Sequence, residues 1–162
     1  MRDAACGFAG SRETPLEVEP LVRRALEPIN AAGLLVNTGG AERFDTFAER
    51  WAKYCRVFLP KPGHKGHPSP YCSPTRLAFE IAAEHHPRWA ELDEHERQLH
   101  ARNSHIMLGP GCDTPVLFLV CWTPGGRVTG GTGQALRIAK AYSIEVINLW
   151  VVTPLFGDAA VV

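Results

Sequence analysis

The chain of 162 residues has no net charge, no long hydrophobic run and no paired-cysteine motif. Its 17 basic residues balance its 17 acidic residues, which argues against duplex nucleic acid and anionic membranes as partners. The longest apolar stretch, residues 116–122, is far too short to cross a bilayer, and no apolar run follows Arg2 to form a signal peptide. We therefore expect a cytoplasmic protein whose binding sites are local.

Motifs for metal binding and for several hydrolases are also missing. The five cysteines are widely spaced and form no C-x-x-C, so we expect reduced thiols. His95, His100 and His105 are five residues apart, and on a helix this spacing carries side chains past one face, away from a shared ion. No G-x-S-x-G motif and no P-loop lysine occur, which disfavours serine hydrolases and nucleoside triphosphate hydrolysis. We expect neither a metal nor a cofactor.

The residues that are present alternate between strand and helix patterns. Short apolar runs predict strands over residues 4–9, 34–36, 55–59, 116–122 and 144–149. Apolar side chains at helical spacing predict helices over 18–29, 44–52, 75–84, 89–102 and from 130 onwards. Pro28 is expected to bend or end the first helix, and residues 60–74, which are rich in proline, to form a loop. This alternation predicts an α/β fold, a Rossmann-like parallel sheet flanked by helices, in a single domain over residues 1–162.

Glycine is concentrated in the segment VTGGTGQALRIAK, residues 128–140, directly before a helical pattern. Glycine permits a positive φ and close approach to the backbone, and a helix start presents free N–H groups with a partial positive charge. The segment therefore predicts a cradle for a phosphate, built from Gly130, Gly131, Thr132 and Gly133. A strand-to-helix turn without a ligand is the alternative.

Two other predicted strands end in polar or glycine turns, and ligands of open α/β sheets bind outside the carboxyl ends of strands. One shared crevice is thus expected, in which the guanidinium of Arg12 matches a phosphate. Asp45 and Glu49 are four residues apart and share a helix face, suited to a ribose or to acid–base chemistry, with a charged outer face as the alternative. Trp51 and Trp122 are expected in the core, with stacking on a base as the alternative. The candidate ligand-binding residues are Ser11, Arg12, Glu13, Gly39, Gly40, Asp45, Glu49, Arg102, Asn103, Thr123, Gly130, Gly131, Thr132 and Gly133.

Five sequence blocks in this order resemble the SLOG superfamily, which includes the Lonely Guy phosphoribohydrolases and the Rossmann domain of DNA-processing protein A. They resemble its small phage-encoded members most. The blocks are GSRETP (10–15), GGAERFD (39–45) with Glu49, ARN (101–103), CWTP (121–124) and GGTGQA (130–135). The resemblance implies a Rossmann-like fold and a nucleotide-type ligand. The chain departs from it at Arg43-Phe44, where phage members carry small residues, and at Gln134 and Arg137, where Lonely Guy enzymes carry a threonine and an acidic residue.

These features favour a binder of a nucleotide-derived small molecule over an enzyme. In the phage setting that the resemblance implies, it would be a sponge that sequesters a host immune signal, such as a cyclic nucleotide or an ADP-ribose derivative. The alternative is a nucleotide N-glycosidase, in which Asp45, Glu49 and Arg12 carry the chemistry. A DNA-associated module is a third hypothesis, which the zero net charge disfavours. We also expect a homo-oligomer, a dimer or a dimer-based assembly, because the apolar tail of residues 150–162 needs a cover.

Overall fold

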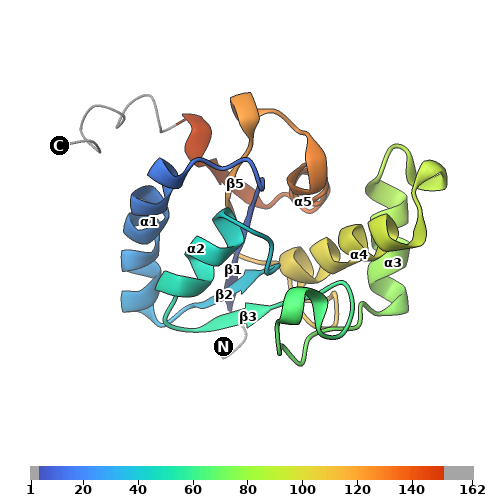
Figure 1. Cartoon of the computed structure of the whole chain (residues 1–162), viewed down its shortest axis with the longest axis horizontal. Helices are drawn as coiled ribbons and strands as arrows, with labels where there is room; N and C mark the ends of the chain where they lie inside the picture. Colours follow the sequence, from blue (N-terminus) through green and yellow to red (C-terminus); the bar gives the residue numbers. More distant parts are fainter. Residues whose placement is uncertain (1–3, 152–162) are drawn as a thin grey trace.

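A computed structural model describes residues 4–151 and shows an α/β domain with an all-parallel, five-stranded sheet (Figure 1). The strands are β1 (Ala5–Gly10), β2 (Leu35–Thr38), β3 (Cys55–Val57), β4 (Phe118–Trp122) and β5 (Glu145–Asn148). They lie in the order β3-β2-β1-β4-β5, so the chain builds one half of the sheet and then returns to the other side of β1. This confirms the predicted Rossmann-like parallel sheet flanked by helices.

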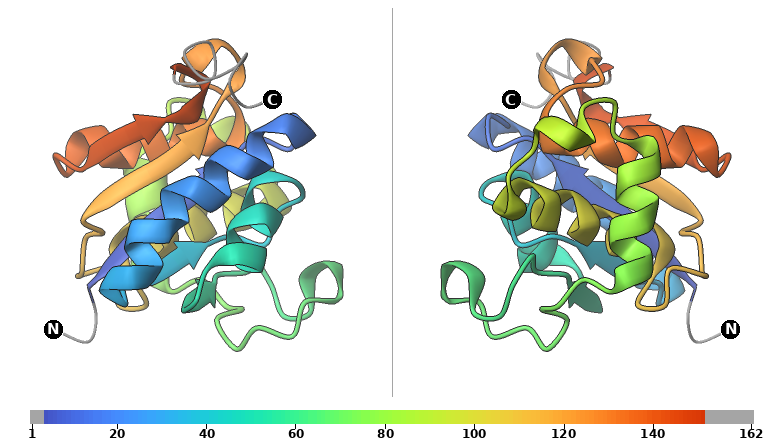
Figure 2. Two further views of the ribbon diagram at one scale, coloured as in Figure 1. Left: turned by 90° about the vertical axis from the view of Figure 1, so that its left-hand side faces the viewer. Right: turned by 90° about the vertical axis from the view of Figure 1, so that its right-hand side faces the viewer.

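Helices cover both faces of the sheet (Figure 2). On one face lie α1 (Glu19–Ala32) and α2 (Phe44–Trp51). On the other lie α4 (Glu94–Leu108) and α5 (Gly130–Ala141), with α3 (Arg76–His85) packed against them. Short 3-10 turns complete the chain: η1 (Leu16–Val18), η2 (His64–Gly66), η3 (Trp89–Glu91) and η4 (Pro124–Gly126).

The sheet separates two hydrophobic cores because side chains alternate between its faces. In β1, Cys6 and Phe8 pack under α1 and α2, whereas Ala5 and Ala9 belong to the core under α4 and α5. A Cβ placed on Gly7 would lie 3.6 Å from the sulfur of Met107, so α4 rests directly on the central strand. The close approach of α4 is what brings its polar residues to the carboxyl end of the sheet.

The helix ends follow local sequence signals. Asp93 caps α4 with a capping box, in which its side chain accepts from the backbone of Glu96 and the Glu96 side chain accepts in return. Thr75 caps α3 with a single hydrogen bond, which its side-chain oxygen accepts from the N–H of Ala78. Gly33 ends α1 with a φ of 71°, in the left-handed conformation that favours glycine.

Three predicted boundaries were wrong. The helix α1 continues through Pro28 to Ala32, because Pro28 lies on the exposed side, where the carbonyl that it leaves unpaired can face solvent. The helix predicted over 89–102 is the turn η3 followed by α4, which the capping box starts at Glu94 and which continues to Leu108. The apolar run 116–122 is not buried throughout, since Leu117 is 56% exposed and the strand begins one residue later.

No helix within residues 4–151 is long and apolar enough to cross a membrane. The apolar tail from which we expect an oligomer lies, from residue 152 onwards, outside the described residues.

Candidate functional site

The carboxyl ends of β1 and β4 form the point at which the chain connections leave the sheet in opposite directions. The chain leaves β1 toward α1 on one face and leaves β4 toward α5 on the other. The two strand ends stay side by side, since the N–H of Ser11 donates to the carbonyl of Trp122 at 3.1 Å. In open parallel sheets such a switch point is where ligands bind. The loops after β1, β2 and β4 therefore surround the expected ligand site.

Asp45, in the first turn of α2, is buried and accepts hydrogen bonds from the backbone of two of these loops. The N–H of Gly10 donates to Oδ1 at 3.3 Å, and the N–H of Ala41 donates to Oδ2 at 3.2 Å. Burial raises the pKa of the Asp45 carboxyl to about 6, against the lowering effects of the Arg102 charge and of the backbone N–H groups. With a backbone donor on each oxygen, Asp45 fastens the loop after β2 to the end of β1.

Arg102, in the second half of α4, is the buried cation that faces Asp45. Its Nη1 donates to the carbonyl of Gly39, and its Nε donates to Oδ1 of Asn103 at 3.1 Å. Burial lowers the pKa of Arg102 and the nearby Asp45 raises it, and the guanidinium remains charged at every accessible pH. Arg102 lies away from the end of the helix, because α4 continues for six more residues to Leu108.

Asn103 extends this arrangement to the glycine cradle. Its Nδ2 donates to the carbonyl of Gly131 at 2.9 Å, while its Oδ1 accepts from Arg102. Two adjacent side chains of α4 thus connect the loop after β2 with the start of α5. Of the predicted residues, the structure brings together Gly39, Asp45, Arg102, Asn103 and Gly131.

The start of α5 has the features of an anion cradle. Gly130 has a φ of 65°, a conformation that favours glycine, and no atom outside the local turn lies within 4 Å of a Cβ placed on Gly131. Thr129, the N-cap residue, makes no side-chain hydrogen bond to the first-turn N–H groups, which have no acceptor within the helix. Thr132 is only 7% exposed, and within residues 4–151 its hydroxyl has no hydrogen-bond partner. Gly133 is buried and closes the turn against the backbone of Val128.

The other predicted residues near these loops have mostly local roles. The Oγ of Ser11 accepts from the N–H of Glu13 at 3.0 Å and so shapes the turn after β1. The side chains of Arg12 and Glu13 are exposed there. Gly40 has a φ of 69° and packs against β3, and the buried Thr123 hydroxyl accepts from Nδ2 of Asn148 at 2.8 Å.

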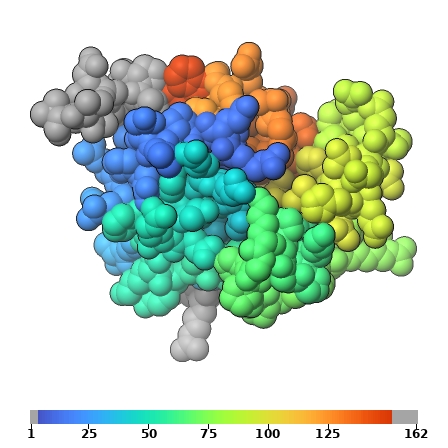
Figure 3. Space-filling model, viewed as in Figure 1, coloured from blue at the N-terminus to red at the C-terminus, as the bar shows by residue number. Residues whose placement is uncertain are grey.

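Glu49 lies apart from the cradle. It is exposed one turn beyond Asp45 and pairs with Nε2 of His67 at 3.0 Å. A second ion pair, between Lys65 and Glu42 at 3.3 Å, also joins the 60–74 loop to the α2 region. In the space-filling view this loop forms the green surface between α2 and the first turns of α4 (Figure 3).

Arg137, at which the chain departs from the Lonely Guy motif, has a fixed geometry in the structure. Its Nε and Nη2 donate to Oε1 of Gln134 at 3.0 and 2.8 Å. Gln134 is fully buried, and its Nε2 donates to the carbonyl of Ala82 on α3 at 3.0 Å. The signal available in the sequence was the spacing of three residues between Gln134 and Arg137, which places both on one side of a helix.

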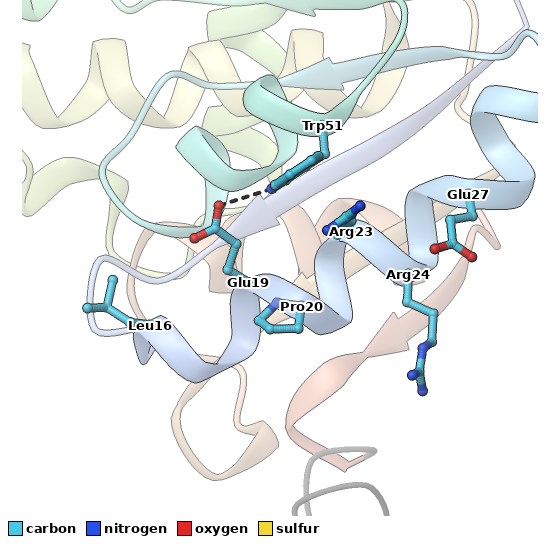
Figure 4. A pocket seen from close by; sticks show the side chains of 7 residues that line it. All are labelled: Leu16, Glu19, Pro20, Arg23, Arg24, Glu27 and Trp51. Atoms are coloured by element: carbon cyan, nitrogen blue, oxygen red, sulfur yellow. Dashed lines mark hydrogen bonds between the residues drawn. The ribbon is translucent and has the colours of Figure 1, made fainter. Parts of the chain in front are cut away.

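A hollow with a volume of about 460 Å³ lies elsewhere, on the outer side of α1 next to α2 (Figure 4). There the Arg23 guanidinium stands 4.4 Å from the ring centroid of Trp51, whose Nε1 donates to Glu19 at 3.0 Å. Trp51 is half-buried and packs against the core under α1 and α2, and Trp122 is buried in that core as predicted.

Among the described residues, no three His, Cys, Asp or Glu side chains are grouped to hold a metal ion, and all five cysteines are free thiols. No family model, curated protein or solved structure with which the chain was compared matches it. Its function is therefore inferred from the geometry at the carboxyl edge of the sheet.

Proposed function

We propose that the chain is a SLOG-like protein that binds a nucleotide-derived small molecule at the carboxyl edge of its sheet, with a phosphate of the ligand at the start of α5. The observation that carries this proposal is the uncapped glycine turn of α5, open to solvent at Gly131 and tied through Asn103 to the buried Arg102. This turn lies at the switch point of the sheet, where the order of the strands favours a ligand.

A phosphate suits this place on chemical grounds. The first turn of a helix offers N–H donors together with a partial positive charge of about half an electron. Thr132 adds a hydroxyl, and the exposed Arg12 on the neighbouring turn adds a guanidinium fork. Because the whole chain is neutral, attraction for an anion arises from this local arrangement and not from a general positive field.

Holding the ligand, and not converting it, is the role that the side chains support. Both oxygens of Asp45 already accept backbone N–H groups, and Glu49 is exposed and paired with His67. Arg137 occupies the position of the acidic residue in the resembling enzymes, and a cation there favours retention of an anion. In a phage-infected cell such a protein would act in the host cytoplasm as a sponge for an immune nucleotide.

Replacement of Gly131 tests the cradle. Gly131→Val places a side chain in the open space before the helix. We therefore expect calorimetric titrations to show at least a tenfold loss of affinity for AMP, ADP and ADP-ribose. A loss of this size corresponds to about one charge-assisted hydrogen bond or more. The melting temperature should change little, because no atom outside the local turn lies within 4 Å of the new Cβ. Lys140→Gln, at the exposed far end of the same helix, is the matched control. Unchanged affinity in a folded Gly131→Val variant would mean that the turn is only structural.

A further inference from the structure

Arg137 is a half-buried cation for which no carboxylate within residues 4–151 serves as a partner. Two of its nitrogens are held by the buried Gln134, so its guanidinium is fixed in direction. The third, Nη1, would lie 3.4 Å from a Cβ placed on Gly133, so it points back toward the start of α5. A cation that is partly removed from water and has no counter-charge nearby destabilises the protein unless it binds an anion. Consistently, burial lowers the pKa of Arg137.

Two histidines from neighbouring helices stand beside this cation. The rings of His86, after α3, and His100, on α4, have centroids 4.3 Å apart. Nδ1 of His100 is buried and has no hydrogen-bond partner among the described residues. Burial and then the charges of His86 and Arg137 lower the pKa of His100 to about 4, so at neutral pH its ring is neutral and carries one N–H donor.

The cluster has more donors than acceptors. His86 uses its Nδ1 to accept from the N–H of Arg88 at 3.1 Å, which leaves the protonated Nε2 as a donor. Arg88 itself is paired with Glu91. The negative charge of Glu96 raises the pKa of His86, but burial and the charge of Arg137 lower that pKa by more.

We propose that Arg137, with His100 and His86, forms a second anion subsite that takes a further phosphate of the ligand held at the start of α5. This second subsite rests on the proposed function, and it restricts the class of ligand to nucleoside diphosphates and their derivatives. The two subsites adjoin, because Asn103 contacts Gly131 and His100 lies three residues earlier on α4, roughly 5 Å along the helix axis. Arginine suits this role because the Nη1–Nη2 edge of its planar guanidinium can still donate two parallel hydrogen bonds to a phosphate.

The ratio of the affinities for ADP and AMP measures this second subsite apart from the first. We expect wild-type protein to bind ADP at least about tenfold more tightly than AMP, the value of one or two charge-assisted hydrogen bonds. Arg137→Gln should remove most of this preference and leave the affinity for AMP unchanged, while its amide can still donate to Gln134. Arg137→Lys keeps the charge without the fork and should retain part of the preference. Lys140→Gln, on the same helix and exposed, should retain all of it.

The outcomes separate the two proposals. If ADP and AMP bind equally, or if folded Arg137→Gln or Arg137→Lys variants keep the wild-type ratio, the second subsite is disproved while the cradle stands. If wild-type protein binds AMP, ADP, inorganic phosphate and pyrophosphate not at all, the proposed function fails, and the second subsite with it. If the melting temperature of Arg137→Gln is far below that of the wild type, the affinity ratio of Arg137→Lys alone decides the test.

Discussion

Asp45 and Arg102 both lie against Gly39, and each contacts the space that a side chain at that position would fill. A Cβ on Gly39 would be 2.6 Å from Nη1 of Arg102 and 2.9 Å from Oδ2 of Asp45. The buried carboxylate holds backbone N–H groups of Gly10 and Ala41, and the buried guanidinium holds the carbonyl of Gly39. Opposite charges and a bare backbone thus fix the loop after β2 at the edge of the sheet.

Gly39→Ala should therefore destabilise the fold and weaken ligand binding together. Both charged side chains are buried and hydrogen-bonded, so neither can move away from a new methyl group without losing partners. We expect a loss of about 1–3 kcal/mol in the free energy of unfolding, the usual range for overpacking. Urea denaturation measures it, with Gly131→Ala as the control, since that methyl group meets open space. Equal stability of the two variants would contradict the packing described here.

The sequence was sufficient to predict the fold and the loops at the site, but not the contacts between them. Periodic apolar residues and glycine turns are local signals, and they identified the parallel sheet and the glycine turn before α5. The contact of Arg102 with Gly39 spans 63 residues of sequence, and no local pattern encodes it. For the same reason Asp45 and Glu49, one helical turn apart, looked alike in the sequence, although one is buried under two loops and the other is exposed.

The stability of the protein should depend on pH through Asp45 in a direction unusual for a carboxylate. Its pKa is raised from 3.8 to about 6, so its protonated form is favoured by folding. The stabilisation is complete below pH 4 and is lost as the pH rises to about 6, by roughly 3 kcal/mol at most. Asp45→Asn removes this dependence, so between pH 4 and 6 its unfolding free energy should rise relative to that of the wild type. Parallel curves in urea titrations at several pH values would refute this.

His100 should act in the opposite direction over the same pH range. Its pKa is lowered from 6.5 to about 4, so its contribution is present above pH 6.5 and is lost as the pH falls toward 4. The half-buried ring is partly screened by solvent, so the effect is smaller than that of Asp45. His100→Asn should therefore gain stability relative to the wild type as the pH is lowered. All other titratable groups contribute equally to the two proteins, so they cancel in the difference between the two unfolding free energies. A difference that stays constant from pH 7 to pH 4 would contradict this prediction.

Self-association is expected at the edge strand β5. Val146 and Ile147 of this strand are 38% and 41% exposed, and an open apolar edge is a template for pairing with another chain. Sedimentation at micromolar concentration should give a mass of at least twice the 17.8 kDa of one chain. Ile147→Lys should shift the protein toward the monomer, whereas Leu77→Lys, at an exposed apolar residue of α3, should not. A monomeric wild-type protein would overturn the expected oligomer.

Ligand should be released unchanged from the protein on denaturation. Hydrolysis of a nucleotide glycoside requires a carboxylate that positions water at the sugar ring and a donor for the departing base. Asp45 is enclosed, with a backbone N–H on each oxygen, Glu49 faces His67, and Arg137 stands where an enzyme of the resembling group has its acidic residue. The protein is incubated with an excess of each of several nucleotides, heated, and the supernatant separated by chromatography. We expect full recovery of every nucleotide. Free base in amounts beyond one equivalent of protein would show instead that the chain is a nucleotide N-glycosidase, and Asp45→Asn, Glu49→Gln and Glu13→Gln would then identify the carboxylate responsible.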